Sequence, residues 1–479
     1  MTSNNQNRLC KTVTPLTTRR DVLRMTSCGF GWLAFSGLFG SIAHGALSES
    51  LAPGAVPLIP DSPLAPKQPH FPARAKRVIF LCMRGGPSHV DTFDYKPQLT
   101  KDSGKPGPRN GSKLLGSKWK FSQCGEGGLW ISDFFPALQK QAGNLCLINS
   151  MKTDLPAHPQ ALVKMHTGNS QFIRPSLGAW TLYGLGTENE NLPGFVSIAP
   201  PSGFGGSQNY GSGFLPAIYQ GTRLGNDGRS IAGAEIPYIQ PKLDRRDQRA
   251  ELDLLNTLNE TKLKRDRVNP DVEGAIEASE LAFKMQTQMP GVVDIAKESE
   301  ATKNLYGIDG SSTDNFGRKL LLARRLAESG VRFIEVTHGN WDHHFNLEEK
   351  MEQSCGEIDR PIAGLLADLK QRGMLEDTLV VWTGEFGRTP YAQGNDGRDH
   401  NNKGFTLWMA GGGAKGGYAY GASDEYGYEA VENPVGIHDL HATILAMLGL
   451  DHERLTFNYA GRDFRLTDVY GNVVQDIIS

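Results

Sequence analysis

The sequence has no excess of charge of either sign, because 50 lysines and arginines stand beside 52 aspartates and glutamates in 479 residues. This balance excludes the basic groove typical of nucleic-acid-binding proteins, so we expect no nucleic-acid partner. Cysteine is scarce. The six cysteines include no CxxC motif, and the distances between them along the chain do not indicate which could form disulfides. No internal repeat is visible, which excludes repeat architectures. What remains is an ordinary globular composition whose 56 glycines predict many tight turns.

A long apolar run is also lacking. The run at residues 28–43 is interrupted by glycines and is shorter than a typical membrane span. Arg19 and Arg20 precede it, as in twin-arginine export signals. We therefore expect residues 1–46 to be a signal read by the twin-arginine export machinery, and the proline-rich residues 47–75 to be a linker. The mature protein would then be periplasmic or secreted without a stable membrane anchor; an uncleaved amino-terminal anchor is the alternative.

Five short apolar runs, each bounded by turn residues, predict buried parallel strands. Between them, apolar residues recur at helical spacing in three segments that end at glycine. Strands that alternate with helices predict one α/β domain over residues 76–479, a three-layer sandwich with a mostly parallel central sheet. The predicted strands are 78–83, 145–148, 331–337, 379–383 and 405–410, and the predicted helices are 315–329, 347–372 and 439–448.

Two other segments interrupt this alternation. The segment from about residue 242 to 305 is highly charged and carries leucines at helical spacing. We therefore expect a helical insertion there that is broken at Pro290-Gly291. Residues 185–237 are rich in glycine, and we expect long loops near a site there, with few strands.

Histidines and carboxylates follow the predicted strands. Ligands of open α/β sheets bind beyond the carboxyl ends of the strands, and seven of the 12 histidines lie in or beside these segments. Imidazole and carboxylate are ligands for Zn, Mn or Fe, although each residue alone also fits an ordinary hydrogen-bonding role. Asp342 and His344 alternate, so both side chains point the same way in an extended stretch. Arg84, Arg388 and Arg398 suit either a bound oxyanion or structural ion pairs.

Seven motifs between about residues 76 and 473 form a more specific pattern. They are GGPSHVDTFD at 85–94, RPSLG at 174–178, WDHH at 341–344, GEFGRTP at 384–390, GRDH at 397–400, AGGG at 410–413 and DLHATI at 439–444. Together with the expected export signal, they resemble the secreted bacterial domain-of-unknown-function 1501 family. That family is regarded as sulfatase-like, within the alkaline phosphatase superfamily. The resemblance implies an alkaline-phosphatase-like fold and a divalent metal, with Zn or Mn preferred and Ca or Mg left open.

The resemblance also assigns roles to individual positions. The loop after the first strand supplies an acidic ligand, and Asp91 is chosen over Asp94. The resemblance aligns a Thr-Ala-Asp-His pattern of the superfamily with Thr383-Gly384-Glu385-Phe386. Glu385 can replace the acidic ligand of that pattern, but Phe386 cannot replace its histidine. The metal ligands that the resemblance implies are Asp91, Asp342, His344, Glu385 and His400.

The nucleophile departs from the sulfatase pattern. A sulfatase places cysteine or serine ten residues before the glycine of a Thr-Gly pair, and counting back from Gly168 reaches His158. Gln160 and Leu162 stand where that motif has proline and arginine, so a formylglycine nucleophile has no precursor here. His158 is therefore expected near the attacked centre, as a metal ligand or a nucleophile. Ser88 and Thr153 are other candidates, and Arg388 would hold the oxyanion.

Three functions follow as hypotheses. The first is an exported hydrolase of phosphate or sulfate esters with two adjacent metal sites, acting on a small-molecule or glycan ester. The second is a sulfatase-like binding protein for an anionic glycan or other envelope ligand that has lost the reaction. The third is a surface or envelope component held by its amino terminus.

Overall fold

The computed structural model describes residues 62–109, 111–233, 239, 241, 243–266 and 269–479. The expected export signal at 1–46 and the linker up to residue 61 lie outside these residues. Residues 62–75 contain no helix or strand and run along the domain, where Lys67 N–H donates to Leu185 O at 2.9 Å. Leu64 is buried in the same stretch. Among the described residues, no helix is both long enough and apolar enough to cross a membrane.

The centre of the domain is an eight-stranded sheet in the order β12-β4-β11-β8-β1-β7-β5-β6. All neighbours pair in parallel except at β11, which is antiparallel to both β4 and β8. The mostly parallel sheet predicted from the sequence is thus confirmed. The strands are β12 (Tyr418–Tyr420), β4 (Leu145–Met151), β11 (Phe405–Ala410), β8 (Thr378–Thr383), β1 (Arg77–Met83), β7 (Phe333–His338), β5 (Phe195–Ile198) and β6 (Thr222–Leu224).

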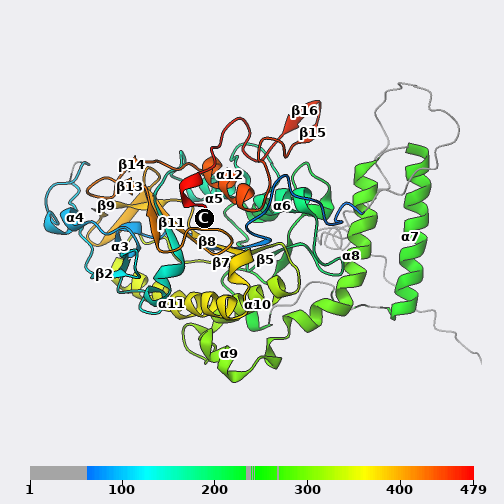
Figure 1. Ribbon diagram of the computed structural model, residues 1–479, viewed down its shortest axis with the longest axis horizontal. Coiled ribbons are helices and arrows are strands. Elements are labelled where there is room, and N and C mark those ends of the chain that lie inside the picture. Colours follow the sequence, from blue (N-terminus) through cyan, green and yellow to red (C-terminus); the bar gives the residue numbers. More distant parts are fainter. Residues whose placement is uncertain (1–61, 110, 234–238, 240, 242, 267–268) are drawn as a thin grey trace, which may run out of the picture.

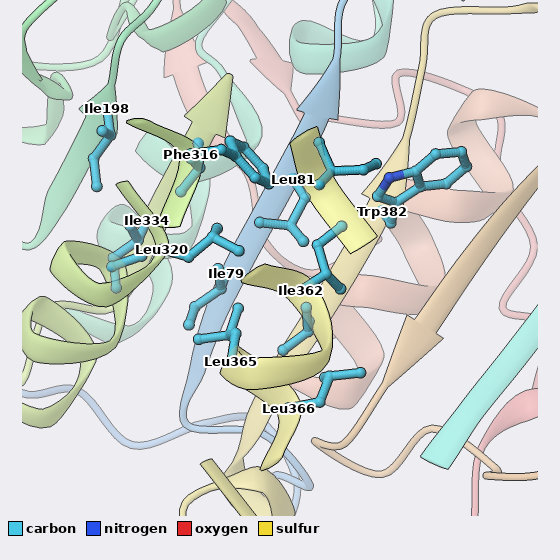
Figure 2. Packing of buried hydrophobic residues seen from close by; sticks show 14 of the residues in the cluster. Ile79, Leu81, Ile198, Phe316, Leu320, Ile334, Ile362, Leu365, Leu366 and Trp382 are labelled. Carbon is cyan, nitrogen blue, oxygen red and sulfur yellow. The ribbon is translucent and has the colours of Figure 1, made fainter. Parts of the chain in front are cut away.

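Helices cover both faces of this sheet, with α10 and α11 on one side and α5, α6 and α12 on the other (Figure 1). Side chains of a strand alternate between the two faces, so Ile79 and Leu81 of β1 pack toward α10 and α11 (Figure 2), while Phe80 and Cys82 pack in the opposite core. Burial on both faces explains why the strands read as unbroken apolar runs. The helices are α3 (His89–Thr92), α4 (Pro97–Lys101), α5 (His158–Thr167), α6 (Leu177–Leu185), α7 (Arg245–Asp266), α8 (Pro270–Val293), α9 (Glu300–Leu305), α10 (Asp314–Glu328), α11 (Leu347–Gln371) and α12 (Ile437–Met447).

Small two-stranded sheets lie at the periphery. One of them, β9 with β10, borders the site described below. The pairs are β9 (Gly387–Gln393) with β10 (Gly397–Asn401), β2 (Phe121–Cys124) with β3 (Leu129–Ser132), β13 (Ala422–Ser423) with β14 (Ala430–Glu432), and β15 (Phe457–Tyr459) with β16 (Arg462–Phe464).

One local expectation was wrong, at Pro290. The glycine-rich residues 185–237 hold few strands, as expected, and the two short ones join the main sheet because β5 pairs with β7 and β6 pairs with β5. The charged insertion is helical as expected, and α7 and α8 form an antiparallel pair at the side of the domain (Figure 1). Pro290 does not break it, however: α8 continues to Val293, and Met285 and Met289 on that stretch are buried against the core. Packing there outweighs the hydrogen bond that proline removes.

Candidate metal centre

Four side chains from three separate segments meet at the carboxyl edge of the sheet. His158 is the first residue of α5, Asp342 and His344 follow β7, and His400 lies on β10. One ligand atom from each lies within 4.8 Å of the others. Asp342 Oδ1 is 2.8 Å from His344 Nε2, 3.2 Å from His158 Nε2 and 3.4 Å from His400 Nε2.

Local backbone features direct these side chains inward. The loop after β7 turns through Asn340 and Asn346, whose φ angles are 70° and 54°. Asparagine tolerates this left-handed region better than most residues. The pairing of β10 with β9 shifts register between Arg398 and His400. Such a bulge re-aims a side chain, so the irregularity accounts for the inward direction of His400.

The three imidazoles each have an acceptor behind them. His158 Nδ1 donates to Glu385 Oε1 at 2.6 Å, and His400 Nδ1 donates to the Pro156 carbonyl at 2.7 Å. His344 Nδ1 donates to Gln393 Oε1. A carboxylate or carbonyl only accepts, so the proton of each neutral ring lies on Nδ1 and the Nε2 lone pair faces the shared point. Histidine ligands of metals typically have this arrangement.

The Nε2 atoms of two of these rings also lie too close together to be stable as neutral side chains with nothing between them. His344 Nε2 and His400 Nε2 are 2.9 Å apart. With both protons on Nδ1, two lone pairs face each other and a carboxylate oxygen, and only a cation or a proton between them makes this arrangement favourable. Three imidazole nitrogens and one carboxylate suit Zn²⁺, Mn²⁺ or Fe²⁺, so the residues present fit a divalent transition metal.

The electrostatics of the cluster keep its carboxylate ionised. Burial would raise the pKa of Asp342, but the neighbouring His158, His400 and Arg388 side chains outweigh it and hold this pKa well below its usual range. Burial would likewise lower the pKa of His158, but the Asp342 and Glu385 carboxylates raise it. The Asp342 side chain is 46% exposed. The centre is therefore open to solvent on one side and accessible to a substrate.

Two further residues expected at the site support the cluster from behind. Glu385 is fully buried; besides His158 it accepts the Gly85 N–H at 3.0 Å. Arg388 is also fully buried and donates to Asp342 Oδ1 at 2.5 Å. Its other donors bond to backbone oxygens of Gly85, Gly86, Trp341 and Arg398. All three guanidinium nitrogens of Arg388 are therefore bonded within the protein.

Asp91 is not brought to the cluster. Its carboxylate is fully buried and accepts two hydrogen bonds from Arg398, at 2.7 and 3.1 Å, and one from Ser88 Oγ at 2.5 Å. Asp94 is equally engaged, by Lys96 at 3.0 Å and by Ser423. These two acidic residues therefore join the loop after β1 to neighbouring segments.

The packing of Phe386 and two of the three acceptors behind the histidines were not predicted from the sequence. The Phe386 ring packs 4.7 Å from the His158 ring and 4.6 Å from the His400 ring, measured between centroids. It thus packs against two of the three imidazoles of the cluster. Pro156 and Gln393 were not predicted, because a backbone carbonyl carries no residue-type signal and Gln393 belongs to no recognised motif.

Several solved structures are similar to this chain at low sequence identity. The PsFucS1 sulfatase from Pseudoalteromonas sp. is 12% identical, with 79% of this chain and 69% of that chain covered and a TM-score of 0.36. The alkaline phosphatase of the Antarctic bacterium TAB5 is 11% identical, with 79% and 99% covered and a TM-score of 0.33. The lipoteichoic acid synthase LtaP from Listeria monocytogenes is 9% identical, with 83% and 76% covered and a TM-score of 0.37.

The curated proteins gave no match to this sequence. One family model does match. It is described as "Protein of unknown function (DUF1501)" and covers residues 75–478, which is most of the chain and the whole α/β domain. The chain therefore belongs to the DUF1501 family.

Proposed function

We propose that this protein is an exported, metal-dependent hydrolase of phosphate or sulfate esters. The observation that carries the proposal is the set of three Nε2 atoms and one carboxylate oxygen around a common point, each ring held by an acceptor at Nδ1. A site with protein ligands on one side and solvent on the other is typical of catalytic rather than structural metal centres.

His158, Asp342, His344 and His400 would hold the metal. When bound, the metal supplies a Lewis acid for the ester oxygens and lowers the pKa of a water molecule toward neutrality. Glu385 fixes the proton of His158 on Nδ1, and Arg388 orients the Asp342 carboxylate toward the three rings. We assign Arg388 this positioning role in place of the oxyanion contact expected from the sequence, because its nitrogens are bonded to the protein.

Water is the nucleophile that this geometry favours. Ser88 is buried and its hydroxyl donates to Asp91, away from the cluster. Within the described chain, no serine, threonine or cysteine side chain is hydrogen-bonded to the four proposed ligands. His158 points its free nitrogen at the shared centre, which favours the ligand role over the nucleophile role.

Metal analysis and ester hydrolysis test this proposal together. Protein purified from its own host should contain a bound transition metal that is lost in the His344→Ala variant. It should hydrolyse aryl phosphates or aryl sulfates, and a chelator should abolish this activity. A protein with less than about one equivalent of metal per chain and no turnover of either ester class would refute the proposal.

A cavity supports the alternative of an anion-binding protein. It has a volume of about 300 Å³ and lies at the carboxyl end of α5, between residues 168–175 and 464–470. The Arg174 guanidinium lines it and stacks 4.4 Å from the Phe464 ring centroid. Arg174 forms no ion pair with a described carboxylate. A flat, unpaired guanidinium suits a sulfate or phosphate group.

The two functions differ in turnover. A binding protein should retain a sulfated oligosaccharide without releasing product, and the Arg174→Ala variant should bind it more weakly by isothermal titration calorimetry. Detection of a desulfated or dephosphorylated product would exclude this alternative. Equal binding by the Arg174→Ala variant would show that the cavity does not hold the anion.

A further inference from the structure

A second group of metal-ligating side chains lies inside the domain. Cys82 on β1, Glu335 on β7 and His166 on α5 bring a sulfur, a carboxylate oxygen and a ring nitrogen within 4.8 Å of one another. All three residues are buried, with exposures of 1%, 1% and 5%. The group shares no residue with the first centre, and His158 and His166 are eight positions apart on α5.

The hydrogen bonds around this group leave its lone pairs facing each other. His166 Nδ1 donates to the Leu162 carbonyl at 2.8 Å, so the neutral ring has a bare Nε2. That nitrogen is 3.2 Å from Glu335 Oε1, which is itself only an acceptor when ionised. His166 Nε2 and both Glu335 oxygens are buried atoms without a hydrogen-bond partner in the described structure. The arrangement needs a proton or a cation between nitrogen and oxygen.

The surroundings make an uncompensated carboxylate costly. Glu335 pairs in register with Phe80 and Ser197 in the middle of the parallel sheet. The Phe80 ring lies 5.7 Å from the His166 ring. Removing an ionised carboxylate from water into the buried middle of a sheet is unfavourable unless an opposite charge compensates it. The charge of Glu335 therefore requires a partner inside the fold.

We propose that Cys82, His166 and Glu335 form a second, structural metal site for a thiophilic divalent cation such as Zn²⁺. A protonated His166 would neutralise one oxygen of Glu335, but it would leave the second oxygen and the thiol without a partner. A cation engages all three side chains. Thiolate, imidazole and carboxylate are a ligand combination that suits zinc.

Thr337 lies beside Cys82 on the neighbouring strand β7. It pairs in register with Cys82, and its hydroxyl oxygen is buried without a hydrogen-bond partner in the described chain. Binding of the cation would displace the thiol proton of Cys82 to solvent, so that the sulfur coordinates as thiolate and one proton is released per metal bound. This site is independent of the proposed hydrolase activity.

Metal content of variants tests this site apart from the first. Cys146 supplies a matched control, because it is a buried cysteine in the same core as Cys82 but belongs to neither metal-ligating group. We expect wild type and Cys146→Ser to hold one more equivalent of metal than Cys82→Ser. His344→Ala should lose metal from the first centre and keep the equivalent that depends on Cys82. Equal metal content in wild type and Cys82→Ser would overturn the inference, whatever His344→Ala does.

A spectroscopic readout covers the case in which Cys82→Ser fails to fold. Wild-type protein unfolded, freed of metal and refolded with Co²⁺ should show the charge-transfer absorption of cobalt–thiolate bonds, and so should Cys146→Ser. Absence of this band in refolded wild type carrying Co²⁺ would show that Cys82 is no ligand and that His166 and Glu335 form an ion pair.

Discussion

The support of His158 by Glu385 gives the sharpest prediction, for the variant Glu385→Gln. Glu385 Oε1 accepts from His158 Nδ1 at 2.6 Å, while Oε1 and Oε2 accept from the Gly85 N–H at 3.0 and 3.1 Å. A glutamine at this position has a single acceptor oxygen and sets an NH₂ group against either Gly85 or His158. In the second orientation the His158 proton moves to Nε2 and blocks the ligand lone pair.

The magnitude follows from comparable supports of metal ligands. Loss of a carboxylate behind a ligating histidine typically weakens metal affinity about 10- to 100-fold. This corresponds to about 1.4 to 2.7 kcal/mol of binding free energy. The loss should be smaller than that of His158→Ala, which removes a ligand outright. Because burial removes Glu385 from solvent, salt should not mask the effect.

A competition titration with a chromophoric chelator measures the metal affinity, and Glu357→Gln is the matched control. Glu357 accepts a hydrogen bond from His338 Nε2 at 2.9 Å, so it forms the same kind of pair outside the cluster. We expect its variant to bind metal like wild type. An affinity of Glu385→Gln within twofold of wild type, or an equal loss in Glu357→Gln, would refute the role assigned to Glu385.

Three further predictions concern stability and export. Asp91→Asn should lower the free energy of unfolding by about 3 to 5 kcal/mol in urea titrations without changing metal content, because it leaves the fully buried Arg398 without its charge partner. Burial lowers the pKa of His441 to about 3, below that of the unfolded chain, so the unfolded state binds the extra proton and stability falls as the pH drops below about 6.5. Relative to His441→Gln, wild type should lose about 1.4 kcal/mol per pH unit between pH 6 and 4, and parallel pH profiles would contradict this. Replacing Arg19 and Arg20 by lysine should retain the protein in the cytoplasmic fraction, and unchanged fractionation would contradict a twin-arginine signal.

The central strands could be predicted because each carries its own signal. Residues 78–83 and 379–383 are apolar on both faces, and a strand covered by helices on both sides requires that pattern. β5 and β6 could not be predicted, since strands of four and three residues in a glycine-rich stretch are stabilised by the sheet: β5 pairs with β7, and β6 pairs with β5. The strand that anchors the pair, β7, lies more than a hundred residues away.

The sequence predicted which segments meet at the site, but not which side chains contact one another there. Strand ends placed Asp91, Asp342, Glu385 and His400 at one edge, but the sequence does not say which carboxylates are neutralised by arginine. The structure pairs Asp91 with Arg398 and Asp342 with Arg388, but only Asp342 also places an oxygen among the three imidazoles. Sequence spacing alone cannot show which of the two aspartates is the metal ligand. That depends on a bulge in β10 that turns His400 toward Asp342.

The paired arginines have a consequence for the chemistry of this edge. The charge of Arg388 is balanced by Asp342, that of Arg398 by Asp91, and that of Arg84 by Asp227 at 2.6 Å. None of them is left to attract the dianionic end of a sulfate or phosphate ester. The positive charge that such a substrate meets must therefore come from the cation held by the four proposed ligands. Without that cation Asp342 is already balanced by Arg388 and Glu385 adds a negative charge, so the same edge offers the ester no net attraction. Metal removal should consequently abolish substrate binding as well as turnover, which distinguishes this centre from one in which free arginines hold the ester and the metal only activates water.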